Sequence, residues 1–138
     1  MRIRAATAAD ADAVVVLWRD TPDVLPTSTD DVTSVEALLQ RDPNALVVAE
    51  TDGRIVGTLI VGWDGWRGNL YRLAVASDAR RARVATTLLA HAESQLHNAG
   101  CRRIAAWVDA GEDHATAFWT AAGYERTEDM RRFVKMPG

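Results

Sequence analysis

The chain lacks most features of secreted, membrane and disulfide-bonded proteins. It has one cysteine, Cys101, among 138 residues, which excludes an internal disulfide and indicates a reducing compartment. Its longest apolar runs, such as residues 13–18, are far shorter than the roughly 20 residues of a membrane span. The opening MRIRAATAAD has no apolar stretch typical of a secretory signal. These absences predict a cytoplasmic protein without a membrane partner.

A surplus of positive charge is missing as well. The formal net charge is -3 at pH 7, so a basic function has to come from a local cluster. The sequence also has no internal repeat, low-complexity tract or linker. Because 138 residues suit one core, we expect a single domain over residues 1–138. No metal site is expected.

Hydrophobic periodicity predicts an α/β chain of the mixed α+β kind, with a strongly twisted mixed sheet flanked by helices. The turn TDG between two β-rich runs is a hairpin signal, because glycine tolerates positive φ. The predicted order is β-α-α-β-β-β-α-β-α-β. Strands are expected at residues 2–6, 45–50, 55–61, 70–76, 104–108 and 130–136, and helices at 8–21, 32–41, 84–99 and 115–122.

An arginine-rich segment, LAVASDARRARVA at residues 73–85, joins a predicted strand to a predicted helix. The first turn of a helix leaves N–H groups unpaired, and its dipole favours an anion there. A strand before and a helix after therefore indicate a phosphate-binding loop. A solvated helix start is the structural alternative. Nucleic-acid binding is disfavoured, because this acidic chain lacks a broad basic surface.

Two motifs between Leu70 and Tyr124 resemble those of the GNAT superfamily of acyl-CoA-dependent N-acyltransferases. The first is similar to [Gln/Arg]-x-x-Gly-x-[Gly/Ala], with Arg80 and Ala85 at its ends. The second, EDHATAFWTAAGYE, is similar to Asn-x-x-Ala-x-x-Phe-Tyr-x-x-x-Gly-[Phe/Tyr]. The two motifs are separated by a helix, a glycine and a strand, as in the family. Matching positions in the second motif are Ala115, Phe118, Gly123 and Tyr124.

The resemblance implies an acetyl-CoA-dependent N-acetyltransferase with a GNAT-like fold. The strand residues would bind the acetyl and pantetheine groups, the loop amides would hold the pyrophosphate, and two aromatic residues would lie against the pantetheine arm. The acetyl-CoA-binding residues implied in this way are Leu73, Ala74, Val75, Arg80, Arg81, Ala82, Arg83, Val84, Ala85, Thr86, Phe118 and Trp119.

Three positions depart from the family pattern. Arg83 replaces the first glycine of the loop, and we expect its side chain to turn outward. The residue is tolerated without strain if its φ stays negative, whereas a positive φ would cost about 1–2 kcal/mol. Glu112 replaces the asparagine that opens the last helix. Trp119 replaces the tyrosine that often protonates the departing thiolate, and an indole N–H donates a hydrogen bond but does not give up its proton.

The reaction needs an oxyanion donor and a path for the amine proton. By resemblance, the Val75 N–H would stabilise the oxyanion. An alkylammonium has a pKa of about 10.4, so a base or a water path is required. Asp109, Glu112 and His114 are the candidate bases, and the sequence does not choose among them. Because no cysteine is placed as an acyl carrier, direct attack of the amine on the thioester is favoured.

The acceptor amine is not fixed by the sequence. An aspartate cluster at Asp20, Asp23, Asp30 and Asp31 suggests a cationic amine. Trp63 and Trp66 suggest either an apolar acceptor wall or a homodimer contact. Family members that acetylate ribosomal proteins often have a glutamate at the position of Trp107, which disfavours that activity. The alternative function is a non-catalytic acyl-CoA-binding sensor.

Overall fold

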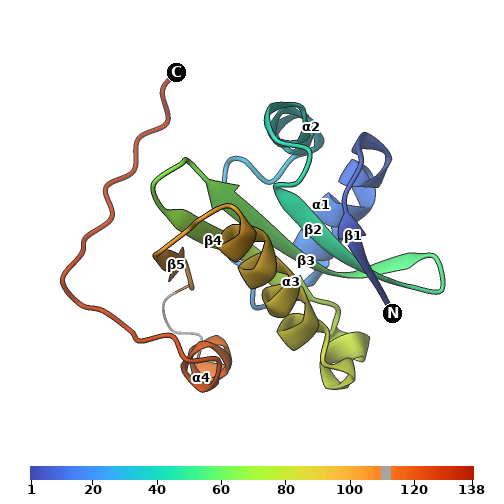
Figure 1. The fold of residues 1–138 in the computed structure, drawn as a ribbon. Helices are drawn as coiled ribbons and strands as arrows, with labels where there is room; N and C mark the ends of the chain where they lie inside the picture. Colours follow the sequence, from blue (N-terminus) through green and yellow to red (C-terminus); the bar gives the residue numbers. More distant parts are fainter. Residues whose placement is uncertain (110–112) are drawn as a thin grey trace.

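The computed structural model describes residues 1–109 and 113–138, and within them five strands form one mixed sheet (Figure 1). The strands lie in the order β1-β2-β3-β4-β5, with antiparallel pairs up to β4 and a parallel β4–β5 pair. The elements are β1 (Arg2–Ala5), η1 (Ala8–Asp10), α1 (Ala11–Asp20), α2 (Val32–Arg41), β2 (Leu46–Thr51), β3 (Arg54–Trp63), β4 (Gly68–Val75), η2 (Ser77–Ala82), α3 (Val84–Asn98), β5 (Ile104–Ala106) and α4 (Asp113–Ala121).

The predicted hairpin between β2 and β3 is confirmed. Thr51 pairs with Arg54, so Asp52 and Gly53 form a two-residue turn. Both have positive φ, 53° and 76°, as the tight turns that suit twisted strands require. The hairpin places β2 and β3 at the centre of the sheet, between β1 and β4.

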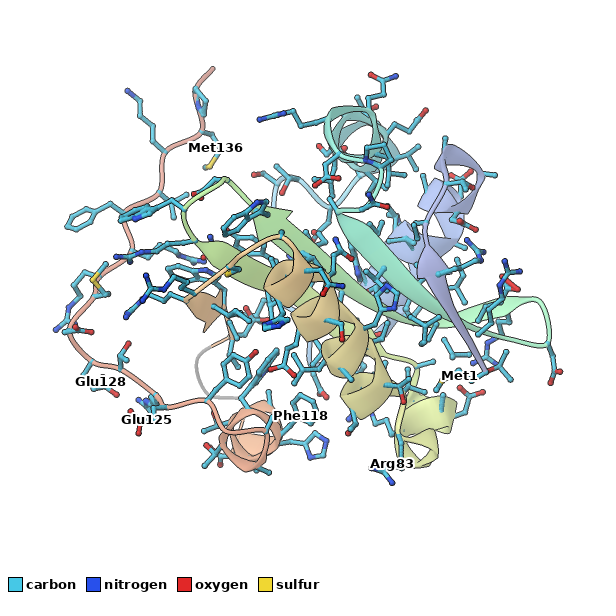
Figure 2. The ribbon with its side chains drawn as sticks, viewed as in Figure 1. Met1, Arg83, Phe118, Glu125, Glu128 and Met136 are labelled. Carbon is cyan, nitrogen blue, oxygen red and sulfur yellow. The ribbon has the colours of Figure 1, made fainter. Side chains whose placement is uncertain are left out.

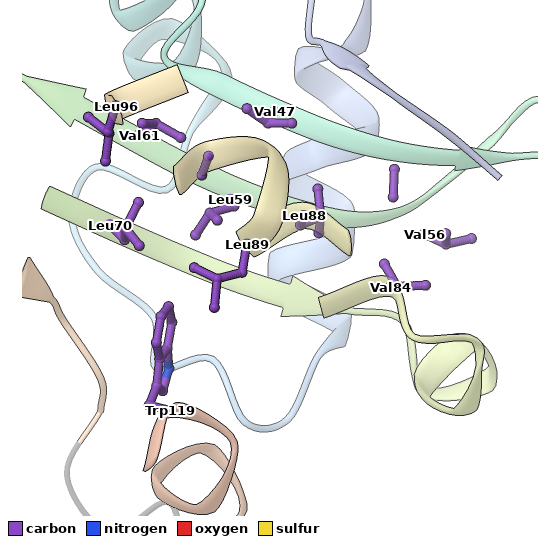
Figure 3. Close-up of a cluster of buried hydrophobic side chains, with 12 residues drawn as sticks. Val47, Val56, Leu59, Val61, Leu70, Val84, Leu88, Leu89, Leu96 and Trp119 are labelled. Atoms are coloured by element: carbon purple, nitrogen blue, oxygen red, sulfur yellow. The ribbon is translucent and has the colours of Figure 1, made fainter. Parts of the chain in front are cut away.

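Helices cover both faces of the sheet, as the hydrophobic pattern predicts (Figure 1). Successive side chains of β2 belong to different cores on the two faces of the sheet. Val47 packs with α3, whereas Val48 packs with α1 and α2. Figure 3 shows the core under α3, where Leu59, Leu70 and Leu88 are fully or almost fully buried. This core fixes the position of α3 against β3 and β4.

The predicted last strand, residues 130–136, is wrong. Residues 125–138 contain no helix or strand, and Figure 1 shows them as an extended chain leaving α4. Phe133 is 94% exposed. The segment has β-forming residues, but a strand also needs a neighbour that accepts its hydrogen bonds and covers its side chains.

The boundaries of β5 and α4 also differ from the prediction. β5 ends at Ala106 rather than at residue 108, because its pairing with β4 stops at Leu70. α4 begins by Asp113, two residues before the predicted start. The early end of β5 leaves the rest of β4 without a neighbouring strand on that side within the described residues.

Candidate functional site

β4 has an open edge beyond Leu70. β5 pairs only with residues 68–70 of β4, and the Trp107 N–H donates the last bond to the Leu70 carbonyl at 3.0 Å. β4 continues to Val75, and no other strand in the described ranges pairs with this edge. Backbone groups on this edge are therefore available to a ligand with amide groups of its own.

A bulge at Arg72 decides which amides face the open edge. The register with β3 shifts between the Tyr71–Ile60 and Ala74–Thr58 pairs, and Arg72 has a φ of 55°. The Ala76 N–H donates to the Val56 carbonyl of β3 at 2.8 Å. Because the N–H groups of successive residues in a strand point alternately to its two edges, the Val75 N–H points to the opposite, open edge. The Leu73 N–H has the same direction as that of Val75.

The bulge is not among the features predicted from the sequence, although a signal for it exists. Leu70, Leu73 and Val75 all pack on the α3 face, whereas Ala74 belongs to the core on the other face. A regular strand would place Leu70 and Leu73 on opposite faces. The spacing of three residues from Leu70 to Leu73, followed by two from Leu73 to Val75, therefore indicates an extra residue between Leu70 and Leu73.

The N-terminus of α3 lies directly after β4 and η2. Its first amides have no partner within the helix, and Ala85 and Thr86 line a cavity beside the open edge. Arg83 precedes the helix with a φ of 60°, so the strained one of the two backbone alternatives applies. This conformation costs a non-glycine residue about 1–2 kcal/mol. The side chain points outward, as expected (Figure 2).

One cavity of about 490 Å³ joins the open edge, the start of α3, α4 and the α1–α2 loop. It brings together most of the residues predicted to bind acetyl-CoA. Val84 is buried beneath the loop and does not line the cavity. Glu112 and the side chains of Arg81 and Ala82 lie outside the described part of the chain. The predicted residues that line the cavity are Leu73, Ala74, Val75, Arg80, Arg83, Ala85, Thr86, His114, Phe118 and Trp119.

Two carboxylates lie in the cavity wall, and both have partners. Asp23 forms an ion pair with Arg80 at 2.5 Å. Asp109 accepts a hydrogen bond from the Leu25 N–H at 3.0 Å, which ties the α1–α2 loop to the end of β5. His114, exposed in the first turn of α4, also lines the cavity.

Three of the four aspartates in the predicted cluster form ion pairs or hydrogen bonds with other residues of the protein. Asp30 is paired with Arg72 at 2.7 Å. Asp31 caps α2 by accepting the Ser34 N–H, which lowers the pKa of its carboxyl group. Asp20 is exposed and does not line the cavity. Of the four aspartates, Asp23 is the one in the cavity wall.

Aromatic residues form two groups, and each group has two members that line the cavity. Tyr71 and Trp107 are stacked, with centroids 6.5 Å apart and planes 8° apart. Burial, followed by the charge of Asp64, raises the pKa of Tyr71. Trp119 is buried between Phe118 and Tyr124 in edge-to-face contacts of 5.3 and 5.0 Å. Trp119 therefore contributes to the core as well as to the cavity wall.

Tyr124 does not supply the hydroxyl that is missing at Trp119. Its hydroxyl donates to Glu93 at 2.9 Å, and it does not line the cavity. Burial and the Glu93 carboxylate raise the pKa of Tyr124.

The two tryptophans predicted as an acceptor wall or dimer contact lie elsewhere. Trp63 and Trp66 line a separate hollow of about 670 Å³, together with Arg67. The acceptor-wall alternative therefore has no support from the cavity. No group of three or more metal-binding side chains occurs in the described residues, and no helix among them is long and apolar enough to cross a membrane.

Residues 12–124 match the family described as Acetyltransferase (GNAT). A curated relative, "Acetyltransferase ECA0875" from Pectobacterium atrosepticum, is 34% identical over 128 residues, covering 93% of this chain and 90% of the relative. A ribosomal-protein-alanine N-acetyltransferase from Brucella melitensis has a similar structure, with a TM-score of 0.76, 25% identity, and coverage of 93% and 86%.

A further solved structure with the same fold contains a ligand. It is the aminoglycoside acetyltransferase AAC(6')-Iy in complex with the bisubstrate analog CoA-S-monomethyl-acetylneamine. Its TM-score is 0.74 at 21% identity, covering 99% of this chain and 98% of that one.

Proposed function

Since the chain belongs to the acetyltransferase (GNAT) family and is an acetyl-CoA-dependent N-acetyltransferase, we propose that its acceptor is a primary amine of a small molecule or peptide. The amine attacks the thioester directly. The observation that carries this proposal is the single cavity that joins the open edge of β4 to the first turn of α3.

The proposed acetyl-CoA site uses backbone groups. The amide-containing pantetheine arm lies along the open edge, where the N–H groups of Leu73 and Val75 point outward. The diphosphate lies at the start of α3, where unpaired amides and the helix dipole favour an anion. Phe118 lines the cavity from α4 and contacts the arm. Arg80 and Arg83 add positive charge beside the diphosphate.

The proposed chemistry forms one C–N bond and breaks one C–S bond. The Val75 N–H donates to the oxyanion of the tetrahedral intermediate. His114 takes the amine proton directly or through water, with Asp109 and Glu112 as the other candidate bases. The second amine proton moves to the departing sulfur, since a thiol has a pKa of about 8.5. Trp119 supports the cavity wall and supplies no proton.

The proposed acceptor is a cationic amine that approaches from the α1–α2 loop. Asp23 and Asp109 place two carboxylates on this side of the cavity. The AAC(6')-Iy complex contains a bisubstrate analog, CoA-S-monomethyl-acetylneamine. A ribosomal-protein acceptor is disfavoured here, because Trp107 donates its indole N–H to Asn69 at 3.0 Å and offers no carboxylate.

Calorimetry followed by a thiol-release assay tests this function. Acetyl-CoA should bind with one site per chain, and a cationic primary amine should release CoA. The N,N-dimethyl form of the same amine is the matched control and should release none. Mass spectrometry should find no acetylated Cys101, and Cys101→Ser should leave turnover unchanged. Binding without thiol release over a broad amine panel would contradict the proposal and favour a sensor.

Other expectations rest on the sequence alone. A single domain over residues 1–138, a cytoplasmic location, the absence of a nucleic-acid partner and a homodimer through Trp63 and Trp66 stay predictions. Analytical ultracentrifugation of the wild type and of Trp66→Ser addresses the homodimer, since Trp66 is 71% exposed.

A further inference from the structure

Arg72 lies where the donor and acceptor sides of the proposed site meet. Its backbone forms the bulge that turns the amides of Leu73 and Val75 to the open edge of β4. Its side chain leaves the sheet and reaches the α1–α2 loop, the loop that supplies Asp23 to the cavity. Arg72 itself lines the cavity.

The guanidinium group of Arg72 holds the loop through three hydrogen bonds. Nε donates to Asp30 Oδ1 at 3.0 Å, and Nη2 donates to Asp30 Oδ2 at 2.7 Å and to Thr27 Oγ1 at 2.9 Å. The side chains of Arg72 and Asp30 are only 13% and 15% exposed. A two-pronged, largely buried contact of this kind fixes direction as well as distance.

The backbone of Arg72 is held by a second set of hydrogen bonds. The Thr58 hydroxyl donates to the Arg72 carbonyl at 2.9 Å, and the Trp18 indole N–H donates to the Thr58 oxygen at 2.9 Å. Thr58 and Trp18 are both buried. The guanidinium carbon lies 5.8 Å from the Trp18 ring centroid, within the range of a cation–π contact. Contacts from Trp18 of α1 and Thr58 of β3 thus hold the bulge in place.

A purely structural ion pair would not need this geometry. Arg4 serves for comparison with Arg72. It binds Asp10 and Glu50 with similar burial, but it lies on β1 and does not line the cavity. Arg72, by contrast, has positive φ. Of the three non-glycine residues with positive φ in the described chain, Asp52 forms the hairpin turn, whereas Arg72 and Arg83 line the cavity. Strained backbone is frequent at functional sites.

We propose that Arg72 is a positioning residue that sets the Val75 amide against the acceptor loop. Its carbonyl, held by Thr58, fixes the oxyanion amide. Its guanidinium, held by Asp30, fixes the loop along which the amine approaches. The inference rests on the proposed function, and it assigns separate kinetic effects to the two contacts.

Four variants test the proposal with the most active amine of the panel. Thr58→Val, which replaces the hydroxyl with a methyl group of similar size, should lower kcat about 10-fold or more with little change in the acceptor KM, since the oxyanion donor is misplaced. Asp30→Asn should raise the acceptor KM about 5-fold while kcat changes little. Arg72→Gln should show both effects. Arg4→Gln is the matched control and should lower thermal stability without either effect.

Two further measurements separate positioning from folding and from the proposed function. Thr58→Ser keeps the hydroxyl and should recover kcat to within about 2-fold of wild type. The ¹H–¹⁵N signals of Leu73 and Val75, with and without CoA, should shift in Thr58→Val and Arg72→Gln but not in Arg4→Gln. This readout needs no turnover, so it tests Arg72 even if no amine is acetylated.

Two outcomes would overturn the proposal. In the first outcome, Arg72→Gln and Thr58→Val lose stability as Arg4→Gln does, but both keep the kcat and the amide signals of the wild type. In the other, Thr58→Val and Asp30→Asn change kcat and KM in the same proportion, which would show that the two contacts do not act on separate halves of the site.

Discussion

Arg80 and Asp23 form an ion pair of 2.5 Å between the phosphate loop and the α1–α2 loop. Their side chains are 34% and 35% exposed, and both residues line the cavity. The pair therefore links the two sides of the proposed site. At the proposed site, an anionic ligand at the start of α3 would compete with Asp23 for the Arg80 guanidinium, and the released Asp23 carboxylate would then face the cavity.

This competition predicts opposite effects at the two positions. Asp23→Asn should bind CoA about 3- to 5-fold more tightly, because a partly exposed ion pair contributes up to about 1 kcal/mol. Arg80→Gln should bind CoA about 10-fold more weakly and with a smaller salt dependence. Calorimetry at low and high salt measures both. Weaker binding by Asp23→Asn would show that the pair organises the loop and does not compete with CoA.

Arg83→Gly should stabilise the free protein and weaken CoA binding. Glycine removes the cost of positive φ, part of which is offset by its greater freedom in the unfolded chain, so a gain below about 1 kcal/mol is expected. The exposed guanidinium is lost at the same time, so CoA affinity should fall several-fold and depend less on salt. Thermal melts and calorimetry provide the two values. A rise in affinity would mean that the Arg83 side chain crowds the phosphate.

Gly57→Ala should shift α3 and weaken CoA binding together with stability. A Cβ at Gly57 would lie 2.6 Å from Val84 Cγ1 and 3.0 Å from Leu88 Cδ1, and overpacking of this kind costs about 1–3 kcal/mol. Gly62→Ala in the same strand is the control, since its Cβ would meet no atom closer than 3.6 Å. Denaturation curves and CoA titrations of both variants test this. Equal behaviour of the two would contradict the close packing of α3 on β3.

The contact between Arg4 and Asp10 predicts an acid-dependent loss of stability. Arg4 lowers the pKa of Asp10 from 3.8 to about 2. Because the folded-state value is the lower one, the stabilisation is complete above about pH 4 and is lost as the pH falls through 2. After allowance for solvent screening we expect about 1 kcal/mol. Urea denaturation of wild type and Arg4→Gln should differ at pH 6 and converge toward pH 2, whereas a constant difference would assign the effect to packing.

The parts of the fold with local signals could be predicted from the sequence. The Asp52–Gly53 turn, the α3 helix closed by Gly100 and the amphipathic helices α1 and α2 each depend on neighbouring residues. The proposed phosphate loop lies at a strand, loop and helix start that follow one another along the chain, and these elements could be predicted for the same reason.

The last strand could not be judged in this way. Residues 130–136 have side chains that suit a strand, yet the Phe133 side chain is exposed to solvent in the structure. Whether such a segment pairs depends on an edge elsewhere in the fold, and composition contains no information about that edge.

The sequence by itself determined the mixed sheet, the succession of strand, loop and helix start at residues 73–85 and the family of this protein, because local patterns and motifs encode them. Only the tertiary structure decided which amides face the open edge of β4 and which aspartate lines the cavity. The Arg72 bulge reverses the direction of the β4 amides after Leu70, and Asp30 is engaged by Arg72 from 42 positions away. Both depend on contacts between residues distant in sequence, which form only when the sheet and the α1–α2 loop are assembled.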